Sequence, residues 1–327
     1  MTLDQTEALS HIRQYFGPAC AIENFTQFKG GARKQVFFLK LRNPSAQCVM
    51  YLWHNAENYF AERVAGGFEE TQTDDKAPAL FLTNTHYLLA QGVNVPRVLH
   101  TGTMDSGHRF AFVEQIMGTD YDKFAATASD RDRQAVLAQI STQLAKLHAL
   151  QRDYPGGLLD APADQGKAPQ ETTLARALLE VTATAVERPQ VAAHQAQISA
   201  KLHALHAALT PRSTYHLLHG ELAGSHVLVQ QSDPAVNDVD AVYFVDIEGI
   251  HYADLEAEHT FLQLIYGADY PYLARTDLDP ARLAFYKFAM HVSLVYAGSC
   301  FLLRGFHDLP WAERLFTGHL AQVLNSL

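Results

Sequence analysis

Residues 217–222 read LLHGEL, and they continue as AGSHVLV through residue 229; further along the chain, residues 243–249 read YFVDIEG. The apolar runs in these segments predict short strands, each ending beside imidazole or carboxylate side chains. A carboxylate near an acceptor can orient or deprotonate a hydroxyl, and hard oxygen ligands hold magnesium against phosphates. This stretch therefore predicts a site for a divalent metal and phosphate.

The chain before this stretch reads as a mixed α and β region up to about residue 116. Alternating and periodic apolar patterns predict its elements, and glycine or proline marks its turns. We expect a helix over residues 4–16, two strands within 25–41 around a Gly30-Gly31 turn, a third strand over 48–53, a loop over 66–78, a helix over 79–91 that ends at Gly92, and strands over 93–99 and 110–115.

From about residue 117 onward the patterns become mainly helical. Ser129 or Asp130 can cap a helix with one apolar stripe, and Asp279-Pro280 is a typical start for a long helix that runs to Leu303. Residues 153–170 suggest a surface insertion, and residues 175–209 suggest two helices separated near Pro189. We expect a small α+β lobe, a larger helical lobe and a cleft between them.

Composition excludes several classes of protein. The 327 residues include 25 Lys and Arg against 35 Asp and Glu, a formal charge of −10 that argues against a nucleic-acid binder. The three cysteines, Cys20, Cys48 and Cys300, are too scattered for a disulfide framework or a thiolate zinc site. The first residues lack the pattern of a secretory signal, and polar residues interrupt the apolar stretch 283–303. We expect a cytoplasmic protein with no membrane span.

The motifs resemble those of the aminoglycoside phosphotransferase-like kinases, a family with the protein-kinase-like fold. That family has an HGD loop with Asn five residues after its Asp, followed by a strand that ends in Asp, often as IDWE. The counterparts here are His219-Gly220-Glu221, His226 and the VDIE of residues 245–248. Further similarities are the LAKLHAL of residues 144–150, the AQGVNVPRVL of residues 90–99, the FVEQIMG of residues 112–118 and the ADLEAE of residues 253–258.

The resemblance implies an α+β, bilobal fold with an N-lobe over residues 1–116 and a C-lobe over residues 117–327. It also implies ATP or GTP as phosphate donor, Mg²⁺ (or Mn²⁺) as metal and a small-molecule hydroxyl as acceptor, whose identity the sequence does not give. The site residues that it implies are Asp246 and His226 for the metal, Glu221 for the acceptor hydroxyl, Gly30 and Gly31 for phosphates, and the backbone from Glu114 to Ile116 for the base.

The departures from the family pattern fall on working residues. Glu221 stands where the family has Asp, and His226 stands where it has Asn. Residues 48–53 lack the lysine that the family uses to hold phosphates, and residues 80–89 lack a glutamate to pair with it; Lys34 or Lys40 can substitute from the preceding hairpin. Two alternatives therefore stay open: a kinase-like protein that binds a ligand without phosphate transfer, and a relative with another nucleotide chemistry such as adenylyl transfer.

Several other residues have structural interpretations. We expect the His219 ring to tie the HGE loop to neighbouring backbone, and Asp254 and Glu258 to brace the same region. His194, His203 and His206 lie along a predicted helix without an HExxH pattern, so a zinc site there is not expected.

Overall fold

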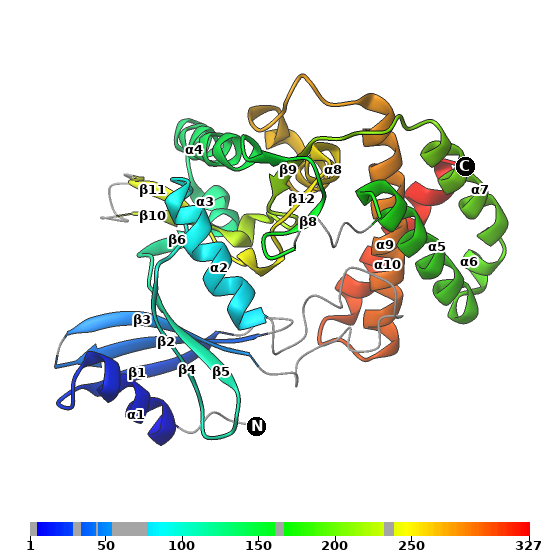
Figure 1. Cartoon of the computed structure of the whole chain (residues 1–327). Coiled ribbons are helices and arrows are strands. Elements are labelled where there is room, and N and C mark those ends of the chain that lie inside the picture. Colours follow the sequence, from blue (N-terminus) through cyan, green and yellow to red (C-terminus); the bar gives the residue numbers. More distant parts are fainter. Residues whose placement is uncertain (1–4, 29–33, 44, 54–76, 161–166, 232–238) are drawn as a thin grey trace.

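The N-terminal part of the chain is a five-stranded antiparallel sheet with one helix on each face (Figure 1). A computed structural model describes residues 5–28, 34–43, 45–53, 77–160, 167–231 and 239–327. The strand order is β1-β2-β3-β5-β4. The elements are α1 (Gln5–Phe16), β1 (Ala21–Phe28), β2 (Lys34–Arg42), β3 (Ala46–Trp53), α2 (Ala77–Ala90), β4 (Val98–Thr103) and β5 (Arg109–Glu114).

Alternation along β2 and β3 decides which helix covers which face. On β3, Cys48, Met50 and Leu52 join the apolar cluster under α1, whereas Val49, Tyr51 and Trp53 join the larger cluster that includes α2. Because successive side chains point to opposite faces, this six-residue apolar run is buried on both sides. β3 is therefore a central strand, and its α2 face looks toward the rest of the molecule.

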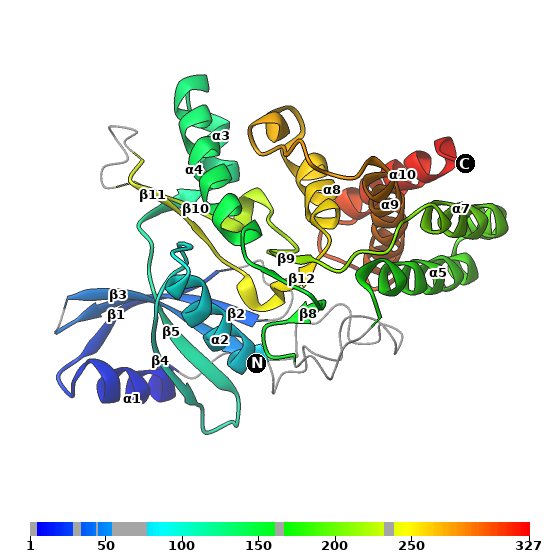
Figure 2. The ribbon, with the colours of Figure 1, turned by 45° about the horizontal axis from the view of Figure 1, so that its top comes forward.

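The C-terminal part is mainly helical and contains two small sheets of short strands. Figures 1 and 2 agree that the N-terminal sheet and the helices α5, α7, α9 and α10 lie at opposite ends of the molecule, with β8, β9 and β12 between them. One sheet has the order β11-β10-β6 and the other β7-β9-β12-β8. The α-helices are α3 (Tyr121–Thr127), α4 (Asp130–His148), α5 (Pro169–Glu187), α6 (Pro189–Ala192), α7 (Gln195–Ala207), α8 (Leu255–Tyr266), α9 (Pro280–Leu303) and α10 (Leu309–Asn325). The short elements are β6 (Gly118–Asp120), β7 (Gln151–Arg152), β8 (Gly156–Gly157), β9 (Tyr215–Leu218), η4 (Gly224–His226), β10 (Val227–Gln230), β11 (Ala241–Phe244), η5 (Ile247–Gly249), β12 (His251–Ala253) and η6 (Gly267–Tyr272).

Most of the predicted elements are confirmed, including the caps. Ser129 accepts a hydrogen bond from the Asp132 amide at the start of α4, and Asp279 accepts from the amides of Ala281 and Arg282 at the start of α9. The strand predicted over residues 93–99 is wrong, since β4 begins at Val98; Pro96 in that run has no amide hydrogen for a strand ladder. The Gly30-Gly31 turn and most of the predicted loop over 66–78 lie outside the described residues.

α9 is the longest helix among the described residues. By length and composition it could cross a membrane. In this structure its residues Phe288, Ala289, Val292 and Val295 form one apolar cluster with residues of α5, α7 and α10. This packing agrees with the prediction of a buried core helix.

The architecture confirms the predicted fold class: an α+β, kinase-like bilobal fold with a small sheet-based N-lobe and a larger, mainly helical C-lobe. The predicted boundary between residues 116 and 117 falls in the segment between β5 and β6.

Candidate active site

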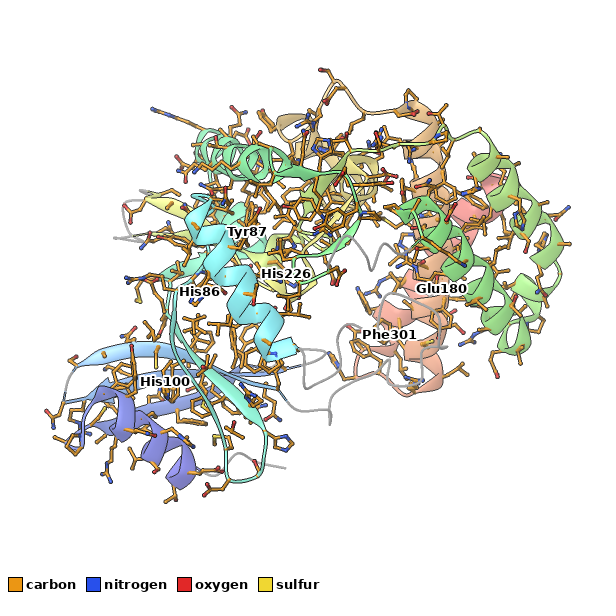
Figure 3. All side chains as sticks on the ribbon, in the orientation of Figure 1. His86, Tyr87, His100, Glu180, His226 and Phe301 are labelled. Atoms are coloured by element: carbon orange, nitrogen blue, oxygen red, sulfur yellow. The ribbon has the colours of Figure 1, made fainter. Side chains whose placement is uncertain are left out.

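The β10–β11 hairpin brings His226 and Asp246 together. β10 and β11 are antiparallel with Val227 opposite Phe244, and the Val245 amide donates to the His226 carbonyl at 3.0 Å. The residue before β10 and the residue two positions after β11 therefore lie at the same end of the hairpin. His226 Nε2 is 3.8 Å from Asp246 Oδ2. Figure 3 shows His226 near the middle of the molecule, between the N-terminal sheet and the C-terminal helices in that view.

Asp246 has an unusual backbone conformation. Its φ is 62° and its ψ is 46°, in the left-handed region that few residues other than glycine adopt. Aspartate tolerates this region better than most residues, and such conformations concentrate at functional sites because surrounding structure must hold them. The turn ends β11 abruptly and leaves the Asp246 side chain 42% exposed.

Lys34, the first residue of β2, reaches Asp246 and Glu248. Its Nζ lies 2.7 Å from Asp246 Oδ1 and 2.6 Å from Glu248 Oε1. Burial opposes the charge of Lys34, but the two carboxylates outweigh it and raise the pKa of Lys34 above its ordinary value. The Lys34 ammonium, with a smaller contribution from His226, lowers the pKa of Asp246 below its usual range. The three side chains therefore form an ion cluster in which Lys34 and Asp246 stay charged at neutral pH.

The HGE loop is held from beneath by a buried carboxylate. Glu258 of α8 accepts hydrogen bonds from the backbone amides of His219, at 2.9 Å, and Gly220, at 3.1 Å. It also accepts from His148 Nε2 at 3.0 Å. Burial opposes ionisation of Glu258, but these bonds and charges lower its pKa to about 2. The expected bracing by Glu258 is confirmed.

His219 and Gly220 fix the path of the loop. His219 Nε2 donates to the Val245 carbonyl at 2.9 Å, so the predicted tie between this ring and neighbouring backbone is confirmed. Burial lowers the pKa of His219, which favours the neutral ring. Gly220 has a φ of +86°, and a Cβ there would lie 3.1 Å from His251 Cε1. The loop therefore requires glycine at this position.

Glu221 lies on the surface at the end of this loop, with its side chain exposed. Its carbonyl accepts from the Ala223 amide at 2.8 Å and from His226 Nδ1 at 2.6 Å. Because a carbonyl only accepts, Nδ1 carries the hydrogen, and in the neutral ring the Nε2 lone pair faces Asp246. An imidazole lone pair and a carboxylate oxygen that face each other suit a cation between them.

The carboxylates of this site suit Mg²⁺ better than a metal that requires a complete protein cage. Among the described residues, no group of three or more His, Cys, Asp or Glu is arranged to hold a metal. Mg²⁺ is usually bound through one or two carboxylates together with waters and substrate phosphates. Asp246, and Glu248 with its buried Oε2 lacking a hydrogen-bond partner, are oxygen ligands of that kind.

The remaining predicted site residues lie on the connection between the lobes or outside the described residues. The Glu114 amide donates to the Arg97 carbonyl at 2.8 Å, and its carboxylate pairs with the Arg97 guanidinium at 3.0 Å. Ile116 lies between β5 and β6, outside both strands. Gly30 and Gly31 lie outside the described residues.

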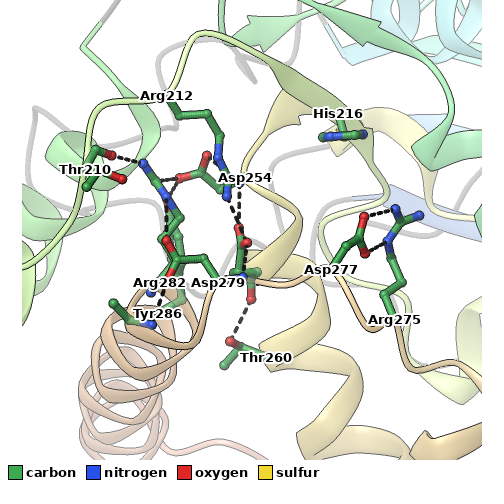
Figure 4. Close-up of polar contacts among 12 residues, drawn as sticks. Thr210, Arg212, His216, Asp254, Thr260, Arg275, Asp277, Asp279, Arg282 and Tyr286 are labelled. Atoms are coloured by element: carbon green, nitrogen blue, oxygen red, sulfur yellow. Dashed lines mark hydrogen bonds and ion pairs between the residues drawn. The ribbon is translucent and has the colours of Figure 1, made fainter.

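Asp254 belongs to a buried polar network, as expected for a structural acid (Figure 4). Its carboxylate is fully buried and contacts Arg282 and Arg212, and it accepts from the Tyr286 hydroxyl at 2.6 Å. Burial raises the pKa of Asp254, while its hydrogen bond with Tyr286 and the two guanidinium groups favour the charged form. The network joins the start of α8 to the start of α9.

Two residues that help to build the site, Glu248 and Asn84, were not predicted from the sequence. Glu248 shares Lys34 with Asp246, and its position two residues after Asp246 in the VDIE motif was the available signal. Asn84 of α2 donates from Nδ2 to the Ile247 carbonyl at 2.8 Å. The sequence signal for Asn84 was a single side-chain amide within an otherwise mainly apolar helix. The hydrogen bond from Asn84 joins α2 to the turn after Asp246.

Comparison with solved structures agrees with this fold. Aminoglycoside phosphotransferase APH(4)-Ia, as a thermostable mutant in its apo form, matches with a TM-score of 0.61 and 15% identity over 96% of this chain and 98% of its own. An aminoglycoside 2'-phosphotransferase in complex with GDP matches with a TM-score of 0.59 and 17% identity over 98% of both chains. The streptomycin–ATP ternary complex of APH(2")-IIa matches with a TM-score of 0.58 and 11% identity over 99% of this chain and 97% of its own. At these identities the likeness establishes the fold.

Sequence comparison establishes the family. A search of curated protein sequences returned no match. The profile of the phosphotransferase enzyme family matches residues 25–286, which include the Lys34–Asp246–Glu248 cluster, the HGE loop and the β10–β11 hairpin. The chain belongs to the phosphotransferase enzyme family.

Proposed function

We propose that this protein transfers the terminal phosphoryl group of ATP or GTP to a hydroxyl of a small molecule. The observation that carries the proposal is the placement of Asp246. It follows a buried strand, lies 3.8 Å from the His226 imidazole, and contacts a lysine from the N-terminal sheet. Phosphoryl transfer depends mainly on positioning and charge neutralisation, which this group of side chains is suited to provide.

The nucleotide would lie between the lobes. Asp246 and His226 would hold Mg²⁺ or Mn²⁺, which supplies neutralisation of phosphate charge when bound. The segment from Glu114 to Ile116 joins the lobes, so its backbone groups are candidates for hydrogen bonds to the base. Since the Glu114 amide is already used, these would come from the Glu114 carbonyl and the Ile116 amide. The backbone amides of Gly30 and Gly31 would bind phosphate oxygens.

Glu221 would orient the acceptor hydroxyl and accept its proton. It lies at the end of a loop that Glu258 and His219 hold in place, while its own side chain is exposed. The glutamate is one methylene longer than the aspartate of the family pattern, so the hydroxyl would lie correspondingly further from the loop backbone. Proton acceptance by a positioned side chain contributes typically about 10²–10⁴-fold to a rate.

The test is phosphate transfer by the purified full chain from γ-labelled ATP or GTP to a panel of aminoglycosides and other polyhydroxylated small molecules. Asp246→Asn should lose the Mg²⁺-dependent thermal stabilisation by nucleotide as well as turnover. Glu221→Gln should keep nucleotide stabilisation and lose about 10²-fold or more in turnover. Asp130→Asn, whose carboxylate is 84% exposed on α4, is the matched control and should behave as the wild type.

One observation favours a second candidate, a protein that binds nucleotide without transferring phosphate. β3 carries no lysine, and its α2 face is lined by Val49, Tyr51 and Trp53. Metal-dependent nucleotide binding together with no labelled product from any acceptor would support this candidate. Phosphate transfer by the wild type would contradict this second candidate. An Asp246→Asn variant that retains normal metal-dependent nucleotide binding would contradict the assignment of Asp246 to the metal.

A further inference from the structure

An aromatic contact occupies the space between β3 and α2 on the side facing the site. Tyr51 and Trp53 of β3 pack against Phe81 of α2, with ring centroids 5.4 Å and 5.6 Å apart. All three side chains are at least 92% buried. Neither Ala46–Trp53 nor Ala77–Ala90 contains a lysine, arginine or carboxylate. No ion pair can therefore link β3 to α2, and β3 offers no cation to a phosphate.

The cation at this place comes from the neighbouring strand. Lys34 begins β2 opposite Trp53, and its side chain is 12% exposed. Its Nζ lies over the Tyr51 ring, 4.9 Å from the centroid, and contacts Asp246 and Glu248. The ammonium is thus held over the ring of Tyr51, which together with Phe81, Phe244 and Asp246 lines a small crevice.

The charges of this cluster do not balance. One ammonium faces two carboxylates, so the group carries a net charge of −1, and Glu248 Oε2 is buried without a hydrogen-bond partner. A divalent cation on Asp246 would satisfy the carboxylates and repel the ammonium beside them, since like charges a few ångströms apart interact strongly in a partly buried site. The nearest anions for the displaced ammonium would then be the phosphates that arrive with the metal.

We propose that Lys34 is the phosphate-binding lysine of this protein, supplied by the second strand in place of the third, and that Asp246 and Glu248 hold it when no nucleotide is bound. The assignment rests on the proposed nucleotide site. Under this assignment the metal ion and the Lys34 ammonium both bind to Asp246 and Glu248. Without nucleotide they compete for these carboxylates, whereas with nucleotide the metal binds the carboxylates and the ammonium binds the phosphates. A lysine with a purely structural function would not reverse its effect in this way.

Two titrations test this reversal. Lys34→Met should weaken binding of Mg²⁺–AMP-PNP by about 10- to 100-fold, as expected for loss of a charge-assisted contact. Without nucleotide, the same variant should bind Mn²⁺ more tightly than the wild type, measured by electron paramagnetic resonance of free Mn²⁺. Lys40→Met is the matched control: Lys40 lies on the same strand, is 51% exposed and forms an ion pair with the exposed Glu23, so both affinities should stay within twofold of wild type.

A double variant that moves the lysine from β2 to β3 provides a second test. Adding Tyr51→Lys to Lys34→Met places an ammonium on β3, and this double variant should bind nucleotide to within about fivefold of the wild-type affinity. The Lys34→Met variant can fail to fold because it leaves the buried Glu248 carboxylate unpaired. The Lys34→Met change is therefore also made in a Glu248→Gln background, where no such carboxylate remains. In that background nucleotide binding should still weaken by about 10-fold relative to Glu248→Gln alone.

The outcomes separate this assignment from the proposed function. If the wild type binds Mg²⁺–AMP-PNP and Lys34→Met binds it equally well, Lys34 is not the phosphate-binding lysine, and the nucleotide site stands. If Lys34→Met weakens binding of both Mn²⁺ and nucleotide, Lys34 only maintains the fold, and the exchange is wrong. If the wild type binds no nucleotide with Mg²⁺ or Mn²⁺, the proposed function and this assignment both fail.

Discussion

Replacing Glu258 by glutamine should lower the free energy of unfolding by about 3 kcal/mol at pH 7. The carboxylate is buried and accepts three hydrogen bonds, from His148 Nε2 and from the amides of His219 and Gly220. Its pKa is lowered from 4.5 to about 2 in the folded chain. Each pKa unit corresponds to about 1.4 kcal/mol, so ionisation of this group stabilises the fold by roughly 3 kcal/mol at neutral pH.

The pH dependence follows from the direction of the change. Because folding lowers the pKa of Glu258, the stabilisation is fully present above about pH 4.5 and is lost as the pH falls toward 2. Roughly 1 kcal/mol should remain at pH 3. Glutamine cannot ionise, so the difference between wild type and variant should shrink over this range while other carboxylates, common to both proteins, cancel.

Urea unfolding of wild type and Glu258→Gln at pH 7, 5, 4 and 3 measures this difference. Glu23→Gln is the control, since its carboxylate is 42% exposed in an ion pair with Lys40, and the cost should stay below about 1 kcal/mol at each pH. A Glu258→Gln difference below 1 kcal/mol at pH 7, or one that does not change with pH, would refute the reasoning.

Two further substitutions test how backbone geometry supports the site. Gly220→Ala should lower the free energy of unfolding by about 1–2 kcal/mol and reduce phosphate transfer, because the φ of Gly220 is +86° and the new Cβ would lie 3.1 Å from His251 Cε1. Thermal unfolding and the labelled-nucleotide assay measure the two effects. Unchanged values for both would contradict the loop geometry. Ser129→Ala should cost about 1 kcal/mol in urea unfolding without changing nucleotide binding, since Ser129 Oγ caps α4: it accepts from the Asp132 amide at 3.2 Å and donates to the Asp132 carboxylate at 2.7 Å. A loss of nucleotide binding would show that the position of α4 affects the site.

Local patterns were sufficient for most of the fold. The Asp279-Pro280 start of α9 and the Pro189 break between α5 and α7 are set by residues next to each other in the chain, so sequence predicts them well. The strand predicted over residues 93–99 failed because apolar content alone does not show which residues find a partner strand. There, Val95 is buried yet precedes β4.

The candidate site was predictable only in part, for a similar reason. The spacing of His219, Glu221, His226 and Asp246 identified the loop and the hairpin, whose geometry is local. The contact between Lys34 and Asp246 joins residues 212 positions apart and depends on how the two lobes meet. Sequence left Lys34 and Lys40 as equal alternatives, whereas the structure places Lys34 in the site and Lys40 in an exposed pair with Glu23.

The aromatic contact between β3 and α2 also affects how the protein responds to ionic strength. Rings hold the helix to the sheet, and the Asn84 amide holds it to the turn after Asp246, so dissolved salt has no ion pair to screen at that junction. The orientation of α2 should therefore be the same in dilute and concentrated buffer.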